Sequence, residues 1–338
     1  LFTTLLPGLN VVTLRIRYYS FYCWLLKRFY EGRKDAKRAD LQRHIRMSEL
    51  LMALIHAQSD NSSGVPGITR ASEIMKKDDE LINFNEDAMP KGKPVGGYWK
   101  GSFGAFGTYY AASLQEMGII APLEDNTSLY NVTSKSEDFI SGENLADAFQ
   151  QSVGSEMGKL FFDVVQSGMV TRAQLALLEP AFQSHNMPAN NERELLLDLL
   201  LQNDRPSSLT DSKLRKDSLR LLLSYMRDCP LNYFSELEFA KYVYDSYNNG
   251  TERSIAAVGW YAYYLNDSRQ YEALNIFDVL LERLRKSEKP GQWEYIDDFS
   301  SILAEEVCVN LGAASCSVGE LLDRWDSVEE PEEKMAHA

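Results

Sequence analysis

The side chains that most often act in catalysis or bind metals are few in this chain, and they lie far apart. Its 338 residues include four histidines and four cysteines. They are His44, His56, His185, His337, Cys23, Cys229, Cys308 and Cys316. Neither a CxxC nor an HExxH spacing, both common in zinc sites, occurs among them. The sequence therefore predicts no metal site, no cofactor and no catalytic residue.

Adjacent carboxylates are the other candidates for chemistry. Asp297-Asp298 and Glu305-Glu306 lie in an amphipathic helical pattern, where runs of charge usually form a solvated face. Glu332-Glu333-Lys334 contains the ExK half of a nuclease motif, but it lies in an acidic tail without a core of β-strands. No acid, base and orienting group come together in the sequence. A non-enzymatic protein is favoured, and a nuclease with an unrecognised site is kept as an alternative.

Three glycines at a spacing of three residues precede a helical pattern. Gly101, Gly104 and Gly107 could form a backbone nest for a phosphate group at the start of that helix. The spacing matches neither GxGxxG nor GxxxxGK[ST], and aromatic residues lie beside it at Phe103 and Phe106. Close packing of the backbone against aromatic rings is the favoured explanation.

Positive charge is concentrated near the start of a chain that is acidic overall, with a formal net charge of −14. Residues 1–60 hold ten Lys or Arg against five Asp or Glu, whereas residues 291–338 hold two against twelve. A basic segment of this kind can follow a phosphate backbone without reading its sequence, or dock on an acidic partner. A solvated link between two buried helices is the alternative. The predicted nucleic-acid or partner-binding residues are Lys27, Arg28, Arg33, Lys34, Lys37, Arg38, Arg43, Arg46, Lys100 and Gln115.

An aromatic segment, Leu9–Tyr30, is the element around which we expect the fold to form. Read as a helix, it is apolar around nearly its whole circumference, which is typical of a helix at the centre of a core. Its uncharged run, Tyr18–Leu26, is far shorter than the roughly 20 residues that a membrane span needs. A charged segment, Arg33–Arg46, which could lie on one or two helices, is followed by a second apolar helix predicted at Met47–Ala57.

Residues 98–140 show the order of elements of a winged helix, which is a variant of the helix-turn-helix. The pattern predicts a helix at Thr108–Met117, a strand at Ile119–Leu123 and a returning strand at Leu129–Thr133. A recognition helix normally offers Arg, Lys, Asn or Gln to DNA, and this helix offers only Gln115. Protein contact or packing is therefore favoured over the reading of bases.

The remaining sequence is predicted to be helical, apart from an exposed loop at Asn83–Gly97 after a short helix at Ile68–Ile82. Further helices are expected at Glu143–Phe149, Gly158–Gln166, Arg172–Ala181, Asn191–Gln202, Asp211–Met226, Phe234–Tyr247, Ser254–Leu265, Asp267–Lys286, Trp293–Leu311 and Ser317–Trp325. The predicted fold class is mainly α, a multi-helix body with an embedded winged-helix-like module. The predicted domains are residues 1–140, with the module at about 98–140, residues 141–327, and an acidic tail at residues 328–338.

Three groups of residues serve as landmarks for comparison. They are Leu6–Asn10 followed by Arg15–Phe21, Tyr98–Gly101 leading to Met117–Ile120, and Gln270–Leu274. These landmarks resemble a poorly characterised group of bacterial proteins that are associated with restriction and anti-phage defence loci. The resemblance implies an accessory subunit that works beside an ATPase or a nuclease, and it carries over no active-site residue.

We therefore expect a cytoplasmic, non-enzymatic accessory or interaction subunit of a bacterial multi-protein assembly. The expected role is defence against phages or plasmids, with an ATPase and/or nuclease subunit as the protein partner and no membrane association. The first alternative is a winged-helix DNA-binding protein that contacts the DNA backbone through the basic residues 27–46. The second alternative is a nuclease whose site the sequence does not reveal.

Overall fold

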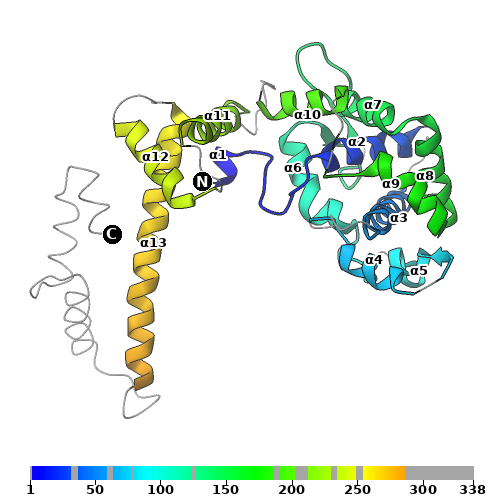
Figure 1. Ribbon diagram of the computed structural model, residues 1–338, viewed down its shortest axis with the longest axis horizontal. Coiled ribbons are helices and arrows are strands. Elements are labelled where there is room, and N and C mark those ends of the chain that lie inside the picture. Colours follow the sequence, from blue (N-terminus) through cyan, green and yellow to red (C-terminus); the bar gives the residue numbers. More distant parts are fainter. Residues whose placement is uncertain are drawn as a thin grey trace, which may run out of the picture. The chain divides into compact units, whose positions relative to one another are not determined.

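The computed structural model of the chain is mainly helical, as the sequence predicts (Figure 1). It describes residues 2–31, 37–58, 64–77, 79–93, 95–123, 126–185, 187, 190–201, 212–229, 234–248 and 254–286. The helices predicted at Trp293–Leu311 and Ser317–Trp325, and the predicted acidic tail, lie outside the described residues.

Helices form most of the regular structure in this part of the chain. They are α1 (Phe2–Leu5), α2 (Arg17–Tyr30), α3 (Arg38–His56), α4 (Ile68–Met75), α5 (Asn85–Ala88), α6 (Ala111–Glu116), α7 (Gly142–Val153), α8 (Ser155–Ser167), α9 (Arg172–Phe182), α10 (Asn191–Leu201), α11 (Ser212–Asp228), α12 (Glu236–Asn248) and α13 (Ile255–Lys286). A short 3-10 helix, η1 (Pro90–Gly92), and a π-helix, η2 (Phe106–Tyr110), lie between α5 and α6. The strands β1 (Leu81–Asn83) and β4 (Met169–Thr171) form one antiparallel pair, and β2 (Ile120–Pro122) and β3 (Tyr130–Val132) form another.

The chain divides into two compact units. The first consists of Leu1–Phe234 with Ser254–Ala257, and the second consists of Ser235–Arg253 with Val258–Ala338. The predicted domain boundary at residue 140 falls inside the first unit, between β3 and α7. Because α7 is the main packing partner of α2, residues on both sides of that position share one hydrophobic core.

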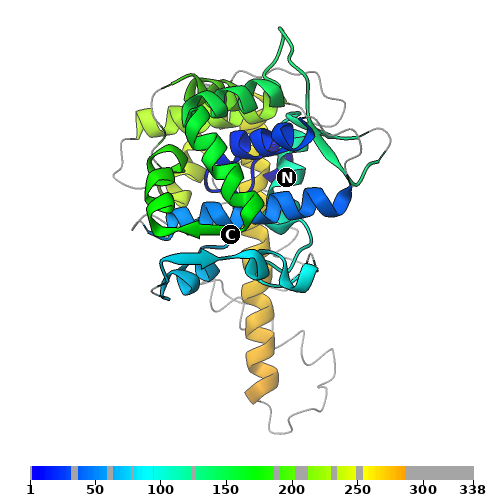
Figure 2. The ribbon, with the colours of Figure 1, turned by 90° about the vertical axis from the view of Figure 1, so that its right-hand side faces the viewer.

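The aromatic helix α2 is buried at the centre of the first unit, which confirms its predicted role. All side chains from Tyr18 to Leu26 are 2% exposed or less. The helix lies against α3 and α7 (Figure 2). The ring of Trp24 packs at centroid distances of 4.4–5.9 Å on four phenylalanines from α7, α8 and α9. This aromatic cluster joins the early and late helices of the unit.

Helix α2 begins at Arg17, whereas the sequence predicts a helix from Leu9. The side-chain oxygen of Asn10 accepts hydrogen bonds from the backbone N–H groups of Val12 at 2.9 Å and Thr13 at 3.0 Å, which closes a local turn. The Asn10 amide group also donates to the Tyr109 carbonyl at 3.1 Å. These contacts hold the backbone in a turn, so the helix begins several residues later.

Helix α3 begins at Arg38, whereas the sequence predicts the start of the second helix at Met47, so residues 38–46 of the charged segment are helical. Leu41 and Ile45 are buried, and they extend the apolar stripe of the predicted second helix beyond its predicted start at Met47. The alternation of charged and apolar residues in this region therefore reflects an amphipathic helix that is half covered by the core.

The segment between α4 and η2 contains more regular structure than predicted. The helix predicted at Ile68–Ile82 ends at Met75, and Ile82 lies in β1 opposite Val170 of β4. The exposed loop predicted at Asn83–Gly97 is also wrong in part, because it contains α5 and its residues Phe84, Ala88 and Met89 are buried. The partner strand lies far along the chain, so no local pattern indicates it.

A helix followed by a hairpin forms where the winged helix was predicted. η2 and α6 account for the predicted helix, and β2 pairs with β3 with Ile120 opposite Val132. The first turn of the helix is a π-helix, so its side chains do not keep regular α-helical spacing. The order of elements agrees with the prediction, and membership of the winged-helix class stays a prediction.

Helix α13 is continuous from Ile255 to Lys286, whereas the sequence predicts two helices divided at Asn266. Asparagine lowers helix propensity only modestly, and neither glycine nor proline occurs near the predicted break. The helix therefore continues through it. Among the residues that the structure describes, no helix combines the length and the apolar character needed to cross a membrane.

Candidate functional site

Two of the predicted cationic residues, at the end of α2, already have ionic partners. The Lys27 ammonium group contacts the carboxylate of Asp147 on α7. Arg28 pairs with Glu31, and its guanidinium carbon lies 5.6 Å from the centroid of the Phe162 ring. These contacts attach the end of α2 to its neighbours, and they leave the two side chains less available to a ligand.

Three other predicted cations, Lys37, Arg38 and Arg43, are exposed at or near the start of α3. The guanidinium carbon of Arg38 lies 5.3 Å from the centroid of the Phe103 ring. Arg43 donates a hydrogen bond to the side-chain oxygen of Asn85 at 2.7 Å. The first half of α3 therefore runs beside residues 85–103.

Arg46 is buried, so it does not belong to the exposed binding surface that the sequence predicts. Its guanidinium group donates to backbone carbonyl oxygens of Ala88 at 2.8 Å, Gly96 at 2.7 Å and Trp99 at 3.2 Å, and of Gly101. Burial lowers the pKa of Arg46 below its ordinary value. The side chain fixes the two ends of the segment 88–101, and its donors are occupied by the protein's own backbone.

The remaining predicted residues lie in three different places. Lys100 is exposed next to Gly101, which Arg46 binds, so it belongs to the segment that runs beside α3. Gln115 is exposed on α6. Arg33 and Lys34 lie outside the described residues. The structure thus brings Lys100 to the same region as the first half of α3, although many residues separate them in the chain.

One turn beyond Arg46, the carboxylate of Glu49 is buried in the core and accepts four hydrogen bonds. The donors are the hydroxyl groups of Tyr22 at 2.8 Å and of Tyr98, and the backbone N–H groups of Ala105 at 2.9 Å and Phe106 at 2.7 Å. Burial raises the pKa of Glu49, and the four donors oppose part of that shift. Gly104 permits this approach, because its φ of +63° disfavours other residues and an added Cβ would overlap the carboxylate.

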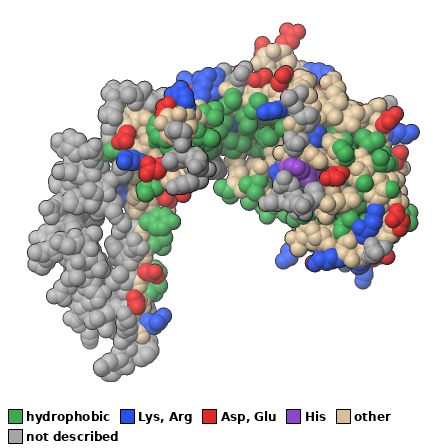
Figure 3. Space-filling model, viewed as in Figure 1, with side chains coloured by type: hydrophobic (Ala, Val, Ile, Leu, Met, Phe, Trp, Pro, Cys, Tyr) green, Lys and Arg blue, Asp and Glu red, His purple; other side chains and the backbone are tan. Residues whose placement is uncertain are grey.

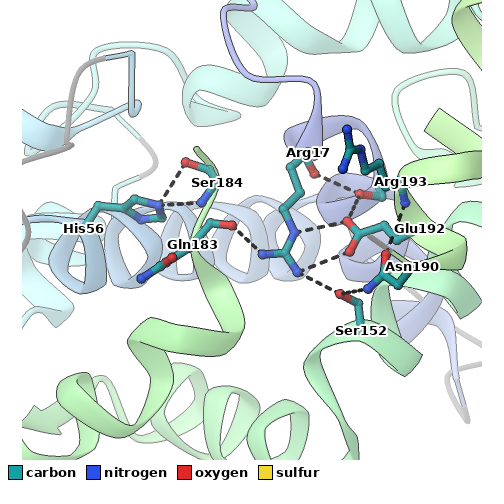
Figure 4. Close-up of polar contacts among 9 residues, drawn as sticks. Arg17, His56, Ser152, Gln183, Ser184, Asn190, Glu192 and Arg193 are labelled. Atoms are coloured by element: carbon teal, nitrogen blue, oxygen red, sulfur yellow. Dashed lines mark hydrogen bonds and ion pairs between the residues drawn. The ribbon is translucent and has the colours of Figure 1, made fainter. Parts of the chain in front are cut away.

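A buried ion pair joins the start of α2 to α10 (Figure 4). Two nitrogen atoms of Arg17 each lie 3.2 Å from a carboxylate oxygen of Glu192. The remaining guanidinium donors bind the Gln183 carbonyl and the Ser152 hydroxyl, and the hydroxyl of Ser20 donates to Glu192 at 2.6 Å. These hydrogen bonds compensate for the removal of both charges from water. The pair therefore joins α2, α7 and α10.

A second buried contact in the same region joins His56 of α3 to Ser184 (Figure 4). The Nε2 atom of His56 lies 2.9 Å from the Ser184 hydroxyl oxygen and accepts the Ser184 backbone N–H at 3.1 Å. Because Nε2 accepts, Nδ1 carries the proton and donates to the Met52 carbonyl at 2.8 Å. Burial lowers the pKa of His56 from 6.5 to about 4, so the imidazole is neutral near pH 7.

A serine hydroxyl bound to a histidine nitrogen is also the arrangement that activates a nucleophile. In this protein the backbone N–H of Ser184 bonds to the same nitrogen, and the other imidazole nitrogen donates to a backbone carbonyl rather than to a carboxylate. Both side chains are buried. We therefore assign the contact to packing, because it attaches the connection between α9 and α10 to the end of α3.

The His56 contact predicts an acid-sensitive fold. Because the pKa of His56 is lower in the folded chain, the unfolded chain binds the proton more readily, and stability falls as the pH falls from 6.5 towards 4. The free energy of unfolding should decrease by about 2 kcal/mol between pH 7.5 and pH 5 because of this group alone. Urea unfolding at the two pH values measures the decrease, which should largely disappear in the variant His56→Gln. The control His185→Gln changes an exposed histidine that makes only a lesser contribution to the lowered pKa of His56, so it should keep most of the decrease; equal pH dependence in both variants would contradict the assignment.

Sequence reasoning missed these buried contacts because their partners come from distant parts of the chain. The one local signal is Glu49, a carboxylate that directly precedes the apolar run Leu50–Ile55 within the predicted second helix. Within the described ranges, no three His, Cys, Asp or Glu side chains are grouped as ligands for a metal ion. Comparisons of the chain with protein-family models, with curated proteins and with solved structures find no match.

The second unit presents a different kind of surface, an apolar face on α13. Tyr271, Leu274, Phe277 and Leu281 are 64%, 61%, 54% and 46% exposed, respectively. At roughly 100° of rotation per residue, the four side chains lie within about one third of the helix circumference. Figure 3 shows green hydrophobic side chains at intervals along this helix. These residues lie within the helix predicted at Asp267–Lys286, and the structure places their side chains on the surface.

Proposed function

We propose that the protein is a non-enzymatic interaction subunit of a multi-protein assembly. The observation that carries this proposal is the exposed apolar face of α13, formed by Tyr271, Leu274, Phe277 and Leu281. A row of large apolar side chains in water is unfavourable by roughly 25 cal/mol per Å² of apolar area, and covering it on association recovers that energy. Aromatic anchors within such a row are the residue types that most often dominate binding energy.

The face has the form of one half of a helix–helix interface. Its residues recur at intervals of three and four positions, which is the spacing by which one helix packs against another. Among the exposed polar residues on the same stretch, Arg269 lies on the opposite side of the helix, and Asp278 and Glu282 lie at the edge of the face on the side of Tyr271. An apolar stripe bordered by charged residues is the pattern of an amphipathic helix that binds a partner helix or groove.

The use of the buried polar groups also supports a non-enzymatic role. The Glu49 carboxylate, the Arg17–Glu192 pair and the His56–Ser184 contact each bind groups of the chain itself. Each of them joins elements of the first unit. These groups therefore have structural partners that account for their burial, and an interaction role does not require a reactive side chain.

The setting we propose for this subunit is a bacterial assembly that acts against phages or plasmids, with an ATPase or a nuclease as the partner. This part of the proposal rests on the sequence landmarks around Leu6–Asn10, Tyr98–Gly101 and Gln270–Leu274. The last landmark lies on α13 and includes two residues of the apolar face. The partner-binding face and one of the landmarks therefore coincide.

Replacing Leu274 and Phe277 together by aspartate should remove the partner and leave the fold intact. Both side chains are more than half exposed, so the charged substitutes cost little within the chain. A charge buried in the interface would weaken binding by at least about 30-fold, since central interface residues contribute about 2 kcal/mol or more. The measurement is recovery of partner proteins with the tagged full chain from its host, followed by the Kd for the purified partner by calorimetry.

Leu237→Asp is the matched control, because Leu237 is 77% exposed on α12 of the same unit. It makes the same chemical change away from the α13 face and should keep the partner at wild-type affinity. Equal loss in the control, or undiminished binding by the double variant, would contradict a partner site on α13. Circular dichroism of each variant shows whether its helices are retained.

A further inference from the structure

A group of exposed cations in the first unit comes from two distant parts of the sequence. Lys37, Arg38 and Arg43 belong to the start of α3, and Lys91, Lys93 and Lys100 belong to the segment after α5. The contacts of Arg38 with Phe103 and of Arg43 with Asn85 place the two parts side by side. We call these six residues the basic surface. Figure 3 shows Lys and Arg side chains gathered at the edge of the first unit near α4 and α5.

The ends of the segment that carries the three lysines are anchored to the core. Arg46 binds carbonyl oxygens at both of its ends, Ala88 on one side and Gly96, Trp99 and Gly101 on the other. The Tyr98 backbone N–H also donates to the Asp87 carbonyl at 3.0 Å. Gly97 has a φ of +65°, and an added Cβ would overlap the Asp87 carbonyl, so the chain can cross itself closely only with glycine there. Anchoring of the two ends limits the ordering entropy that binding would cost.

The charge of the basic surface is not neutralised by the chain around it. In the part of the chain that the structure describes, none of the six side chains forms an ion pair. Asp40 and Glu86 are the exposed carboxylates on α3 and α5, and Asp87 is paired with Arg70 at 2.6 Å. Six cations beside two exposed carboxylates leave an excess of positive charge in a chain whose net charge is −14.

We propose that the basic surface binds the phosphate backbone of a nucleic-acid duplex. This inference goes beyond the proposed function, because it concerns different residues in a different unit. Most of the six side chains are lysines, which bind phosphates as point charges without reading bases. The centre of a protein interface normally contains several apolar or aromatic anchors, whereas Val95 is the single large apolar residue that is exposed among the described residues between Lys91 and Lys100. The composition therefore fits a polyanion rather than an acidic protein.

The proposal differs in its residues from the binding segment that the sequence predicts. Arg46 is not a binding residue in this proposal, because its donors are occupied by backbone carbonyl groups. It supports the surface instead. Lys27 and Arg28 form ion pairs elsewhere on α2 and are left out. Lys91 and Lys93 are added to the binding residues, although the sequence places them in a loop far from the basic segment. The helix with Gln115 is not needed for contacts with the backbone.

The test measures binding of the full chain to a short fluorescent DNA duplex over a range of salt concentrations. Wild-type affinity should fall steeply with salt, because bound phosphates release their counterions. The triple variant Lys91→Gln/Lys93→Gln/Lys100→Gln should bind at least about 10-fold more weakly, and its logarithmic salt slope should be smaller by about 2 to 3, the value for three lost phosphate contacts. All three side chains are exposed, so folding should be unaffected.

The matched control is Lys159→Gln/Arg193→Gln/Lys241→Gln, which removes the same charge from exposed positions on α8, α10 and α12. It should bind DNA like the wild type. Equal loss in the two triple variants would overturn the proposal by showing only a net-charge effect. Absence of salt-dependent DNA binding by the wild type would also overturn it, as would polyglutamate competing as well as DNA. Duplex RNA in parallel assays distinguishes the type of nucleic acid. None of these outcomes depends on the α13 face.

Discussion

Replacing Glu49 by leucine should destabilise the first unit by about 4 kcal/mol or more, because it removes the acceptor of four buried hydrogen bonds. A buried donor without a partner costs about 1–3 kcal/mol, and this change leaves two hydroxyl groups and two backbone N–H groups in that state. The backbone donors at Ala105 and Phe106 cannot turn away, because the helix fixes them. The substitution therefore removes the contacts by which Glu49 joins α2, α3 and the start of η2.

Urea unfolding of the Glu49→Leu variant checks this expectation. The tryptophan fluorescence of the chain, to which Trp24 and Trp99 of the first unit contribute, should show a transition at a much lower urea concentration than in the wild type. Ser48→Ala is the control on the same helix, because Ser48 is equally buried and its hydroxyl has no hydrogen-bond partner among the described residues. That variant should lie within about 1 kcal/mol of the wild type. Similar unfolding midpoints for the two variants would contradict the role assigned to Glu49.

Replacing Arg17 by methionine should destabilise the first unit by about 3–5 kcal/mol, the typical cost of leaving one member of a buried ion pair without its partner. The Glu192 carboxylate would keep only the hydroxyl of Ser20 as a side-chain donor. The double variant Arg17→Met/Glu192→Leu removes both charges, so it should be more stable than the sum of the two single losses predicts. The free energy of unfolding of all four proteins gives this coupling.

Arg28→Ala provides the comparison on the same helix. It removes an ion pair with Glu31 in which both side chains are nearly half exposed, and it should cost less than about 1 kcal/mol. A large loss in Arg28→Ala, or single and double variants whose losses simply add, would contradict the view that burial makes the Arg17–Glu192 pair important.

The central helix could be predicted from the sequence because its aromatic residues are adjacent in the chain. The run Tyr18–Leu26 is apolar on every side, which only a buried helix can satisfy. The start of the helix could not be predicted, because it depends on the contact between Asn10 and Tyr109. The helix and hairpin at residues 106–132 could also be predicted, because the residues that form their pattern are close together in the chain.

The buried charges could not be predicted, because a charged residue in a helix has the same local pattern whether it faces water or the core. Arg46 and Arg43 are three positions apart in one basic segment, yet one binds four backbone carbonyl groups and the other is exposed. The difference is set by the return of residues 88–101 over one face of α3. The pairing of β1 with β4 could not be predicted either, because the paired residues Ile82 and Val170 lie far apart in the chain.

The candidate surfaces follow the same rule. Lys37, Arg38, Arg43 and Lys100 were predicted as binding residues and are exposed in the structure, but their grouping with Lys91 and Lys93 requires the fold. The exposure of the α13 face could not be predicted, because a helix rich in aromatic residues has the sequence pattern of a core helix. Only the packing of α13 distinguishes its buried residues Ala257 and Trp260 from its exposed residues Tyr271 and Phe277.

The most direct test of an interaction subunit is the composition of the wild-type complex in its own host. The tagged full chain is purified with and without nuclease treatment, and its mass is measured in solution by light scattering during size-exclusion chromatography. We predict a second polypeptide, an ATPase or a nuclease, that elutes with the chain in a fixed ratio and survives the treatment. Recovery of the chain alone, or with nucleic acid only until the nuclease is added, would contradict the proposed function.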